Sequence, residues 1–482
     1  MSTVLVRFMM MNNKSQIYRI IVATVLLLAL GVGIPLSSWA QQDTVEVSLQ
    51  EFINKGLENS EKINYEKQKV RLAENKVKQA RSQRILPKLE LSTQHGIVPG
   101  VESDVPGLAK DEYYLDPDLE NDWQDWGIFT RAEINAVQPL FSWGALKNAV
   151  NAARSAAVAA QKQFKKQKAD LRLRLFDLYQ SYLLTSEIVR LLDDAEDKIA
   201  DIEKQIKKKQ SEKNSDFDDS DEFKFEIYKS EFEIRAAEVR QNAATTQRIW
   251  NYVLQADSGT VYMPDTYFLD PSSQKIKEIA FYRSKAMSSR AEINAAEAGI
   301  EAAEYGLQAL KQKNYPALFL GLTASYANTP NRPRQSNPFI INNSNYATAT
   351  FGVGIRQNLN FLSMKNDLEK GRVQKKQAKY LKEAAVEGIV LEINEAYKEA
   401  SLSRIKVDKT DKALVAGKKW LRQEQLDYDF GTGETKDLID ALKKELELRV
   451  RLKREIFQLN TNMAELYRKS GLPITKIMTE EE

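Results

Sequence analysis

The chain has 482 residues, a formal net charge of +3 and no cysteine. Its length allows two or three globular domains, and the near-neutral charge gives no footprint for nucleic acid. The lack of cysteine excludes disulfides, thiolate metal sites and the acceptor that a bacterial lipoprotein needs after its signal. Only 20 glycines and 13 prolines accompany 28% charged residues, which favours long helices over short strands.

The first 40 residues are predicted to be a signal peptide that is removed. Lys14 and Arg19 precede an apolar run over 20–34, and Ser38-Trp39-Ala40 supplies small residues before a cut. The run is shorter than the roughly 18 residues of a spanning helix, although an uncleaved anchor is the alternative. An unlipidated periplasmic protein and an outer-membrane β-barrel protein both fit these features.

Helical periodicity dominates the rest of the chain. Ser48 to Glu51 has the spacing of a capping box, and Pro87 stops the first helix. Two stretches of roughly 65 residues lack any interruption, which corresponds to about 100 Å at the rise of an α-helix. The predicted helices cover residues 48–84, 144–208, 220–255, 275–313, 363–428 and 434–470.

Four segments alternate with a period of two and are predicted to be strands of about ten residues. They begin near Leu89, Ile128, Leu318 and Ala347. This length suits a tilted strand that crosses a bilayer, and one apolar and one polar face suit a water-filled barrel. The residues predicted to line the lumen are Arg131, Glu133, Asn135 and Arg356. A small, half-buried antiparallel sheet in a soluble protein is the alternative.

Long polar loops join the strands of each pair. The loop over 98–125 is acidic and ends at Trp123 and Trp126, where an interfacial aromatic belt would place them just before the second strand. The loop over 328–345 is rich in asparagine and proline. Such loops suit the outer rim of a barrel.

The long helices carry two adjacent apolar stripes, which predicts a neighbour on each side, as in a wall of helices. The stripes of the first long helix are Leu171, Leu175, Leu178, Tyr182, Thr185, Val189, Leu192, Ile199 and Ile206, and beside them Phe176, Tyr179, Leu183, Ile188, Leu191, Ala195 and Ile202. Two short helices stacked end to end match one long helix in length, so we expect antiparallel struts of equal height.

Each long helix turns back at a tip. In the second tip, over 428–441, Gly431 and Gly433 permit a tight turn and Glu434 favours the next helix N-terminus. The first tip lacks glycine, so Asn214 and Ser215 are predicted to turn the chain, with Ser220 as the N-cap. Its carboxylates form either a solvated acidic loop or a ring that repels anions, binds divalent cations or favours opening.

The chain also repeats itself. Residues 146–154 and 364–372 are two versions of one segment, each after a strand and each opening a long helix. The correspondence spans more than any solenoid unit and indicates a tandem duplication of one helix–strand–strand–helix unit. The predicted parts are a signal peptide (1–40), a first repeat (41–262), a linker (263–274) at the waist, a second repeat (275–470) and a tail (471–482).

The second tip, the strand end Gln138–Gly144 and the doubled layout together resemble the TolC-like outer-membrane efflux protein family, over about residues 45 to 470. The resemblance implies a homotrimer in which each subunit gives four strands to one twelve-stranded barrel and its helices to a periplasmic tunnel. It also implies that the tips close the tunnel until it meets a periplasmic adaptor and an inner-membrane pump of the RND, ABC or MFS type. The residues then expected at the tip and gate are Asp216, Asp218, Asp219, Asp221, Tyr428, Phe430, Gly431, Gly433, Asp437 and Asp440.

Nothing in the sequence points to catalysis. His95 is the only histidine, so histidine dyads and histidine-rich metal sites are excluded, and no phosphate-cradling loop is present. We expect a passive conduit of the Gram-negative outer membrane without enzyme activity, cofactor, metal or lipid anchor. It would serve either tripartite efflux or type I protein secretion. The alternative from another class is a periplasmic coiled-coil spacer without a pore.

Overall fold

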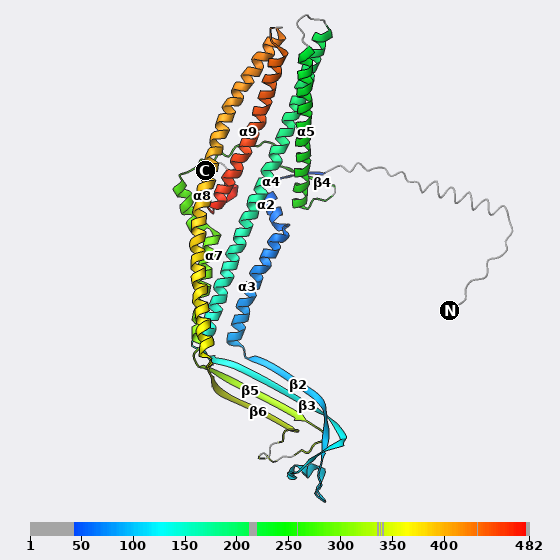
Figure 1. Cartoon of the computed structure of the whole chain (residues 1–482), viewed down its shortest axis with the longest axis vertical. Helices are drawn as coiled ribbons and strands as arrows, with labels where there is room; N and C mark the ends of the chain where they lie inside the picture. The colour runs from blue at the N-terminus through cyan, green and yellow to red at the C-terminus, as the bar shows by residue number, and fades with distance from the viewer. Residues whose placement is uncertain are drawn as a thin grey trace, which may run out of the picture.

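A computed structural model describes residues 43–211, 219–257, 259–334, 337, 339, 342–430 and 432–478. The molecule is a long rod of helices with a curved sheet at one end (Figure 1). Among the described residues, no helix combines the length and the apolar character needed to cross a membrane.

Two unbroken helices run along the rod, as the sequence predicts, with 67 and 69 residues. The helices are α2 (Leu49–Glu58), α3 (Glu61–Ile85), α4 (Ala145–Ser211), α5 (Asp219–Leu254), α6 (Ile279–Ser289), α7 (Ala291–Lys313), α8 (Phe361–Asp429) and α9 (Thr435–Lys469), with 3₁₀ turns η1 (Lys110–Leu115) and η2 (Ile474–Ile477).

The predictions of single helices over 48–84 and 275–313 are wrong. The first is divided because Ser60 adopts an extended conformation and its hydroxyl accepts a hydrogen bond from the Ile63 amide at 3.4 Å, which starts a new helix. The second is divided at Arg290, which is also extended and whose side chain is drawn into ion pairs. Each break lies at the waist of the rod, between stacked helices.

The sheet contains β2 (Lys88–Glu102), β3 (Glu120–Phe141), β5 (Ala317–Asn328) and β6 (Tyr346–Arg356), antiparallel in the order β2-β3-β5-β6. The predicted length of about ten residues is wrong for β2 and β3, which have 15 and 22 residues. Their hairpin continues beyond an irregularity between Pro99 and Gly100, so Trp123 and Trp126 lie inside β3. A bulge lets the paired strands extend past the apolar segment.

A second, unpredicted sheet lies at the waist. β1 (Asp43–Val47) pairs in parallel with β4 (Thr260–Pro264), which falls across the junction of the first repeat and the linker. The linker beyond β4 is bound to the helices. Asn460, fully buried, accepts a hydrogen bond from the Ser272 amide at 2.8 Å and donates to the Asp270 carbonyl at 2.8 Å. Its polar contacts thus join the linker to α9.

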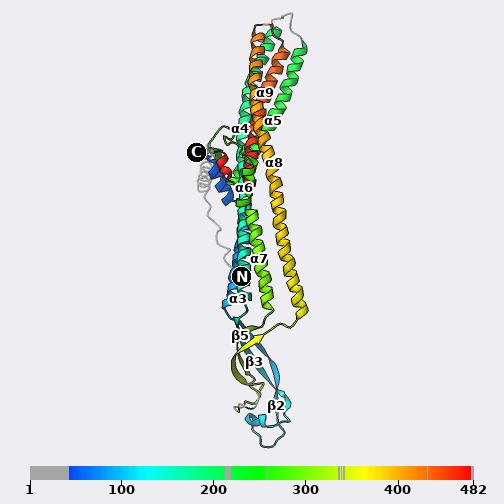
Figure 2. The same ribbon diagram turned by 90° about the vertical axis from the view of Figure 1, so that its left-hand side faces the viewer.

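Long and short helices pack side by side, as predicted. α8 packs against α9 in the tip half and α7 in the sheet half, while α4 packs against α5 and α3 in the same two halves (Figures 1 and 2). α4 also contacts α7 and α9 and therefore joins the two predicted repeats. Members of both predicted stripes of α4 are buried, namely Leu175, Phe176, Tyr179, Leu183, Ile188, Leu192, Ala195, Ile199, Ile202 and Ile206.

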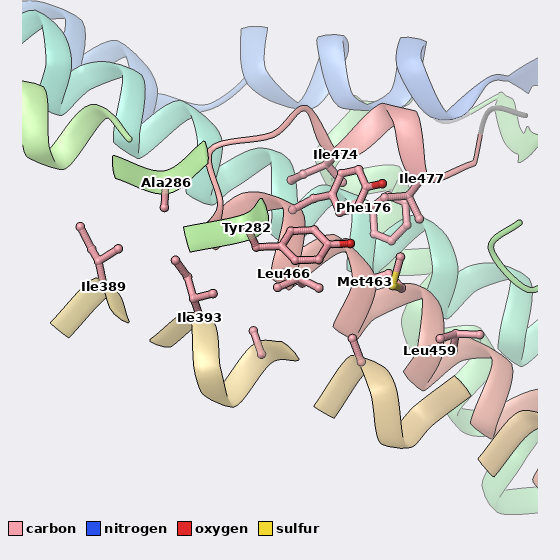
Figure 3. Close-up of a cluster of buried hydrophobic side chains, with 14 of the residues drawn as sticks. Phe176, Tyr282, Ala286, Ile389, Ile393, Leu459, Met463, Leu466, Ile474 and Ile477 are labelled. Carbon is pink, nitrogen blue, oxygen red and sulfur yellow. The ribbon is translucent and has the colours of Figure 1, made fainter. Parts of the chain in front are cut away.

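A buried apolar cluster holds the waist together (Figure 3). Tyr282 of α6, Ile393 of α8 and Met463 of α9 meet Phe176 of α4 in it. Ile477 of η2 is also fully buried there, so part of the segment predicted as a tail packs into the core. This packing holds α4, α6, α8, α9 and η2 together where the two halves of the rod meet.

Candidate functional site

The four-stranded sheet has one polar and one apolar face. The register places Arg131 opposite Gln94 and Ala327, and two residues further Glu133 opposite Ser92 and Ser325. Since side chains alternate between faces, all four residues predicted to line a lumen lie on the same polar face. That this face lines a water-filled lumen stays a prediction.

Polar side chains on this face bond to one another. The Thr323 hydroxyl donates to the Asn135 amide oxygen at 2.8 Å, and the Asn135 amide nitrogen donates to Glu133. Lys88 and Glu90, further along β2, form an ion pair of 3.1 Å. A face with these side chains is compatible with water and unfavourable in hydrocarbon.

The opposite face is apolar and uncovered. Leu91 is 66% exposed, Ile128 65% and Phe351 79%. Soluble monomers rarely expose apolar patches of this extent. The predicted alternative, a sheet half-buried against the protein's own helices, is not what the structure contains, because the sheet projects beyond the helical rod (Figures 1 and 2).

The two edges of the sheet lack a partner within the described part of the chain. β2 forms one edge and β6 the other, and the strands alternate in direction between them. β6 of one copy could therefore pair antiparallel with β2 of the next. In lipid such pairing is required, because each unsatisfied backbone group costs several kcal/mol.

The sheet joins the helical rod through a sharp turn after β3. Trp143 and Gly144 both have positive φ, at 54° and 89°. Glycine has no Cβ to oppose this conformation, whereas Trp143 is held in it by a hydrogen bond of 2.8 Å from its indole nitrogen to the Pro316 carbonyl. The strand end Gln138–Gly144 thus sets the angle between sheet and helix.

The second outer loop is fastened to the first hairpin. The Asn331 side chain donates to the Val98 and Asp125 carbonyls at 3.3 and 3.1 Å, and Arg332 donates to the Pro99 carbonyl. Asn331 lies against Gly127, where a Cβ would approach its side-chain oxygen to 2.2 Å. Because Gly127 shares the polar face, this loop bends over that side of the sheet.

The second tip is a compact turn between α8 and α9. Tyr428 is 3% exposed and packs in an apolar cluster with Leu438 and Ile439, so within one subunit it supports the tip and does not line its surface. Phe430, by contrast, is 79% exposed. Asp437 and Asp440 are exposed on α9, and Gly431 lies outside the described residues.

Glu434 occupies the N-cap position of α9 without a side-chain capping hydrogen bond. Glu434 therefore stabilises the N-terminus of α9 only through its negative charge and not through a capping hydrogen bond. The turn is instead closed by the Asp427 carbonyl, which accepts hydrogen bonds from the Thr432 and Gly433 amides, both at 2.9 Å.

The first tip lies mostly outside the described residues, and Asp216, Asp218, Asn214 and Ser215 are among those left out. Asp219 is the first residue of α5 and Asp221 lies in its first turn. The prediction of Ser220 as N-cap is wrong, because the helix begins one residue earlier. In the described parts of the chain, no three acidic or histidine side chains are grouped closely enough to hold a metal ion.

Gly433 gives a direct test of the second tip. A Cβ there would lie 2.8 Å from the Tyr428 amide nitrogen and 2.9 Å from the Asp427 carbonyl carbon, and backbone atoms cannot yield. We expect Gly433→Ala to open the turn without unfolding the rod. Amide hydrogen exchange of the α8–α9 turn should accelerate about tenfold or more.

Gly388→Ala is the matched control, because a Cβ at this helical position meets nothing within 4 Å. That variant should exchange as the wild type does and gain slightly in helix propensity. Unchanged exchange at the tip of Gly433→Ala would contradict the packing described.

Comparisons with known proteins agree with this geometry. Residues 282–471 match the family described as outer membrane efflux protein. The solved outer-membrane channel OprN is 13% identical, covers 88% of this chain and 90% of its own, and superposes with a TM-score of 0.69. CusC is 16% identical, with coverages of 91% and 95% and a TM-score of 0.68.

The outer membrane channel MtrE of Neisseria gonorrhoeae, solved in its open state, is 14% identical, with coverages of 90% and 91% and a TM-score of 0.68. No curated protein sequence matches the chain. Identities this low establish a shared fold, and the family match covers less than half of the chain. Residues 282–471 thus match the outer membrane efflux protein family, and the chain as a whole shares the fold of these outer-membrane channels.

Proposed function

We propose that this protein is a passive outer-membrane channel-tunnel, the exit duct of a tripartite efflux system. The observation that carries the proposal is a sheet with one polar and one bare apolar face, attached to a helical rod with two helices of 67 and 69 residues. A sheet with two such faces suits lipid on its apolar side and water on its polar side. The rod would then extend through the periplasm.

The channel is a homotrimer in this proposal. Four strands do not enclose a pore, and three copies give twelve strands with every edge paired. Apolar side chains on α8 support the same association, because Tyr380 and Leu391 are 67% and 68% exposed in a single chain. They would be covered by a neighbouring copy.

The tips are proposed to form the periplasmic gate, where the tunnel meets an adaptor protein and an inner-membrane pump. Exposed Phe430 and the acidic side chains of Asp437 and Asp440 are available there on the second tip. The carboxylates of the first tip would be tripled by symmetry into a negative mouth. The predicted signal peptide over 1–40, together with a sequence that contains no cysteine to accept a lipid, supports a channel without a lipid anchor.

The proposal is tested by fractionating cells that express the full chain and by measuring the purified protein. We expect recovery in the outer membrane, a native mass of three subunits in detergent, and steady conductance in planar bilayers. Release as a soluble monomer without detergent would refute the channel and support the spacer. Export of a protein substrate by the assembled system would favour type I secretion over small-molecule efflux.

A further inference from the structure

Two phenylalanine rings lie flat on the polar face of the sheet. Phe319 of β5 is paired with Gly354 of β6, and a Cβ on that glycine would approach the ring to 2.7 Å. Phe129 of β3 is paired with Gly96 of β2, where the corresponding distance is 2.5 Å. In both pairs glycine leaves room for the ring against the backbone of the neighbouring strand. Aromatic rings are unexpected on a face whose other side chains are mostly polar.

An arginine guanidinium lies over each of the two rings. The guanidinium carbon of Arg356 lies 4.8 Å from the centre of the Phe319 ring, within the range of a cation–π contact. Arg131 lies 5.9 Å from the centre of Phe129, and it also donates a hydrogen bond of 3.3 Å to the Asn343 carbonyl. The Arg356 stack is thus the closer of the two and is not tied to a loop.

Arg356 has no carboxylate within ion-pair distance in the part of the chain that the structure describes, and its side chain is exposed. Lys88 and Glu90 of β2, at the opposite edge of the sheet, pair with each other. Glu133 accepts a hydrogen bond from Asn135. Among the described residues of one chain, no carboxylate therefore lies close enough to neutralise the positive charge of Arg356. It lies at the last residue of β6, the end of the strand that faces the helical rod.

We propose that Arg356, stacked on Phe319, is a binding position for aromatic organic anions inside the barrel, at the end that joins the tunnel. This inference rests on the proposed function, because it requires the polar face to line a pore. The guanidinium lies over the Phe319 ring, and the Arg356 side chain is exposed in a single chain, so its far face is accessible to a ligand. An aromatic carboxylate or sulfonate would stack on that open face and accept hydrogen bonds along the edge.

Threefold symmetry would place three such cations around one level of the pore. Charge on the wall of a narrow, water-filled passage raises the local concentration of ions of opposite sign. The position is therefore expected to act in two ways. It attracts small anions by charge alone, and it retains aromatic anions through stacking in addition.

The test uses the intact trimer in planar bilayers, with a potassium chloride gradient and with 1-naphthalenesulfonate as the probe. In the wild type, the probe should block current at lower concentration than an aliphatic sulfonate of equal charge. Arg356→Gln should shift the reversal potential towards cation preference and weaken the block about tenfold or more. Glu133→Gln, which removes a negative charge from the same face, should shift the reversal potential in the opposite direction.

Two further variants separate charge from stacking. Arg356→Lys and Phe319→Leu both retain the positive charge, so the reversal potential should stay near that of the wild type. Both disturb the stack of guanidinium on ring, so the block should weaken by about fivefold. They also keep the inference testable if Arg356→Gln fails to assemble.

The outcomes are distinguishable. A conducting channel in which Arg356→Gln changes neither reversal potential nor block would overturn the inference and leave the proposed function intact. Equal block by the aromatic and the aliphatic sulfonate would overturn the stacking. A wild-type protein that forms no conducting trimer would reject the proposed function, and the inference with it.

Discussion

Phe351→Arg is expected to keep the chain out of the outer membrane, whereas Thr350→Arg, one residue away, should insert. Phe351 lies in the middle of β6 on the apolar face and is 79% exposed. Thr350 pairs with Thr323 on the polar face. An arginine on the lipid side of a barrel costs about 2–4 kcal/mol near the midplane, and a trimer would carry three. On the water side the same residue keeps its hydration.

The measurement is the amount of each variant recovered in the outer membrane as a heat-resistant trimer. The two substitutions introduce the same side chain into the same strand, so a general effect on β-propensity cancels between them. Equal insertion of both variants would contradict the assignment of the apolar face to lipid. A loss confined to Thr350→Arg would indicate that the two faces are assigned the wrong way round.

Arg290→Met is expected to destabilise the waist by about 3 kcal/mol at neutral pH. The Arg290 side chain is 5% exposed and pairs with Glu292 and Glu392, both at 2.8 Å. Arg468 of α9 also contacts Glu292, at 3.1 Å, as well as Asp170 of α4. These charges connect α4, α7, α8 and α9. Removing Arg290 leaves Glu292 buried with one cation fewer.

The effect of this substitution should depend on pH. Burial alone would raise the pKa of Glu292, but the hydrogen bonds and charge of Arg290, with a contribution from Arg468, hold it at about 2. This pKa lies below the ordinary value of 4.5, so ionised Glu292 stabilises the fold above about pH 5. That contribution is lost as the pH falls towards 2. The difference between wild type and Arg290→Met should therefore shrink below about pH 4.

Denaturant unfolding of the detergent-solubilised trimer, followed by its helical circular dichroism, measures this difference. Arg372→Met is the matched control, because Arg372 and Glu369 form an ion pair of 3.0 Å in which both side chains are more than half exposed. Water screens such a pair, so the control should change stability little. Equal losses in the two variants, or a loss that persists unchanged at pH 3, would show that the buried pairs do not hold the waist.

Much of the fold could be predicted from local patterns. The period of the apolar residues separated strands from helices, and the repeated segments 146–154 and 364–372 indicated that one layout occurs twice. The alternation within each strand also placed Arg131, Glu133, Asn135 and Arg356 on one face, because side chains alternate whatever the partner strand is. The division of the chain into two repeats with a linker between them remains our proposal.

The errors arose where distant segments decide local structure. Nothing near Arg290 in the sequence stops a helix, and the break depends on carboxylates from α7 and α8 that fix its side chain. The β1–β4 pair joins segments more than two hundred residues apart, so neither segment by itself indicates its partner. The place of Tyr428 in a gate stays a prediction, and its burial depends on packing between α8 and α9.

In the sheet, too, some features could be predicted from local patterns and others depend on contacts between strands. Alternation alone places Arg131 and Arg356 on one face of the sheet, but it does not predict the rings beneath them. Glycines within a strand normally indicate a bulge or a close approach, and Gly96 and Gly354 gave no indication of which residue approaches. Only the register, which pairs them with Phe129 and Phe319, identifies the ring that occupies the space.

The amino-acid sequence by itself determined the periods of the helices and strands and the approximate lengths of α4 and α8, because these follow from the geometry of a single helix or strand. The tertiary structure alone decided strand register, the break at Arg290, and the stack of Arg356 on Phe319. These features require two separate segments to come into contact, and the free energy of the contact depends on the side chains of both segments. Local patterns describe only one partner at a time.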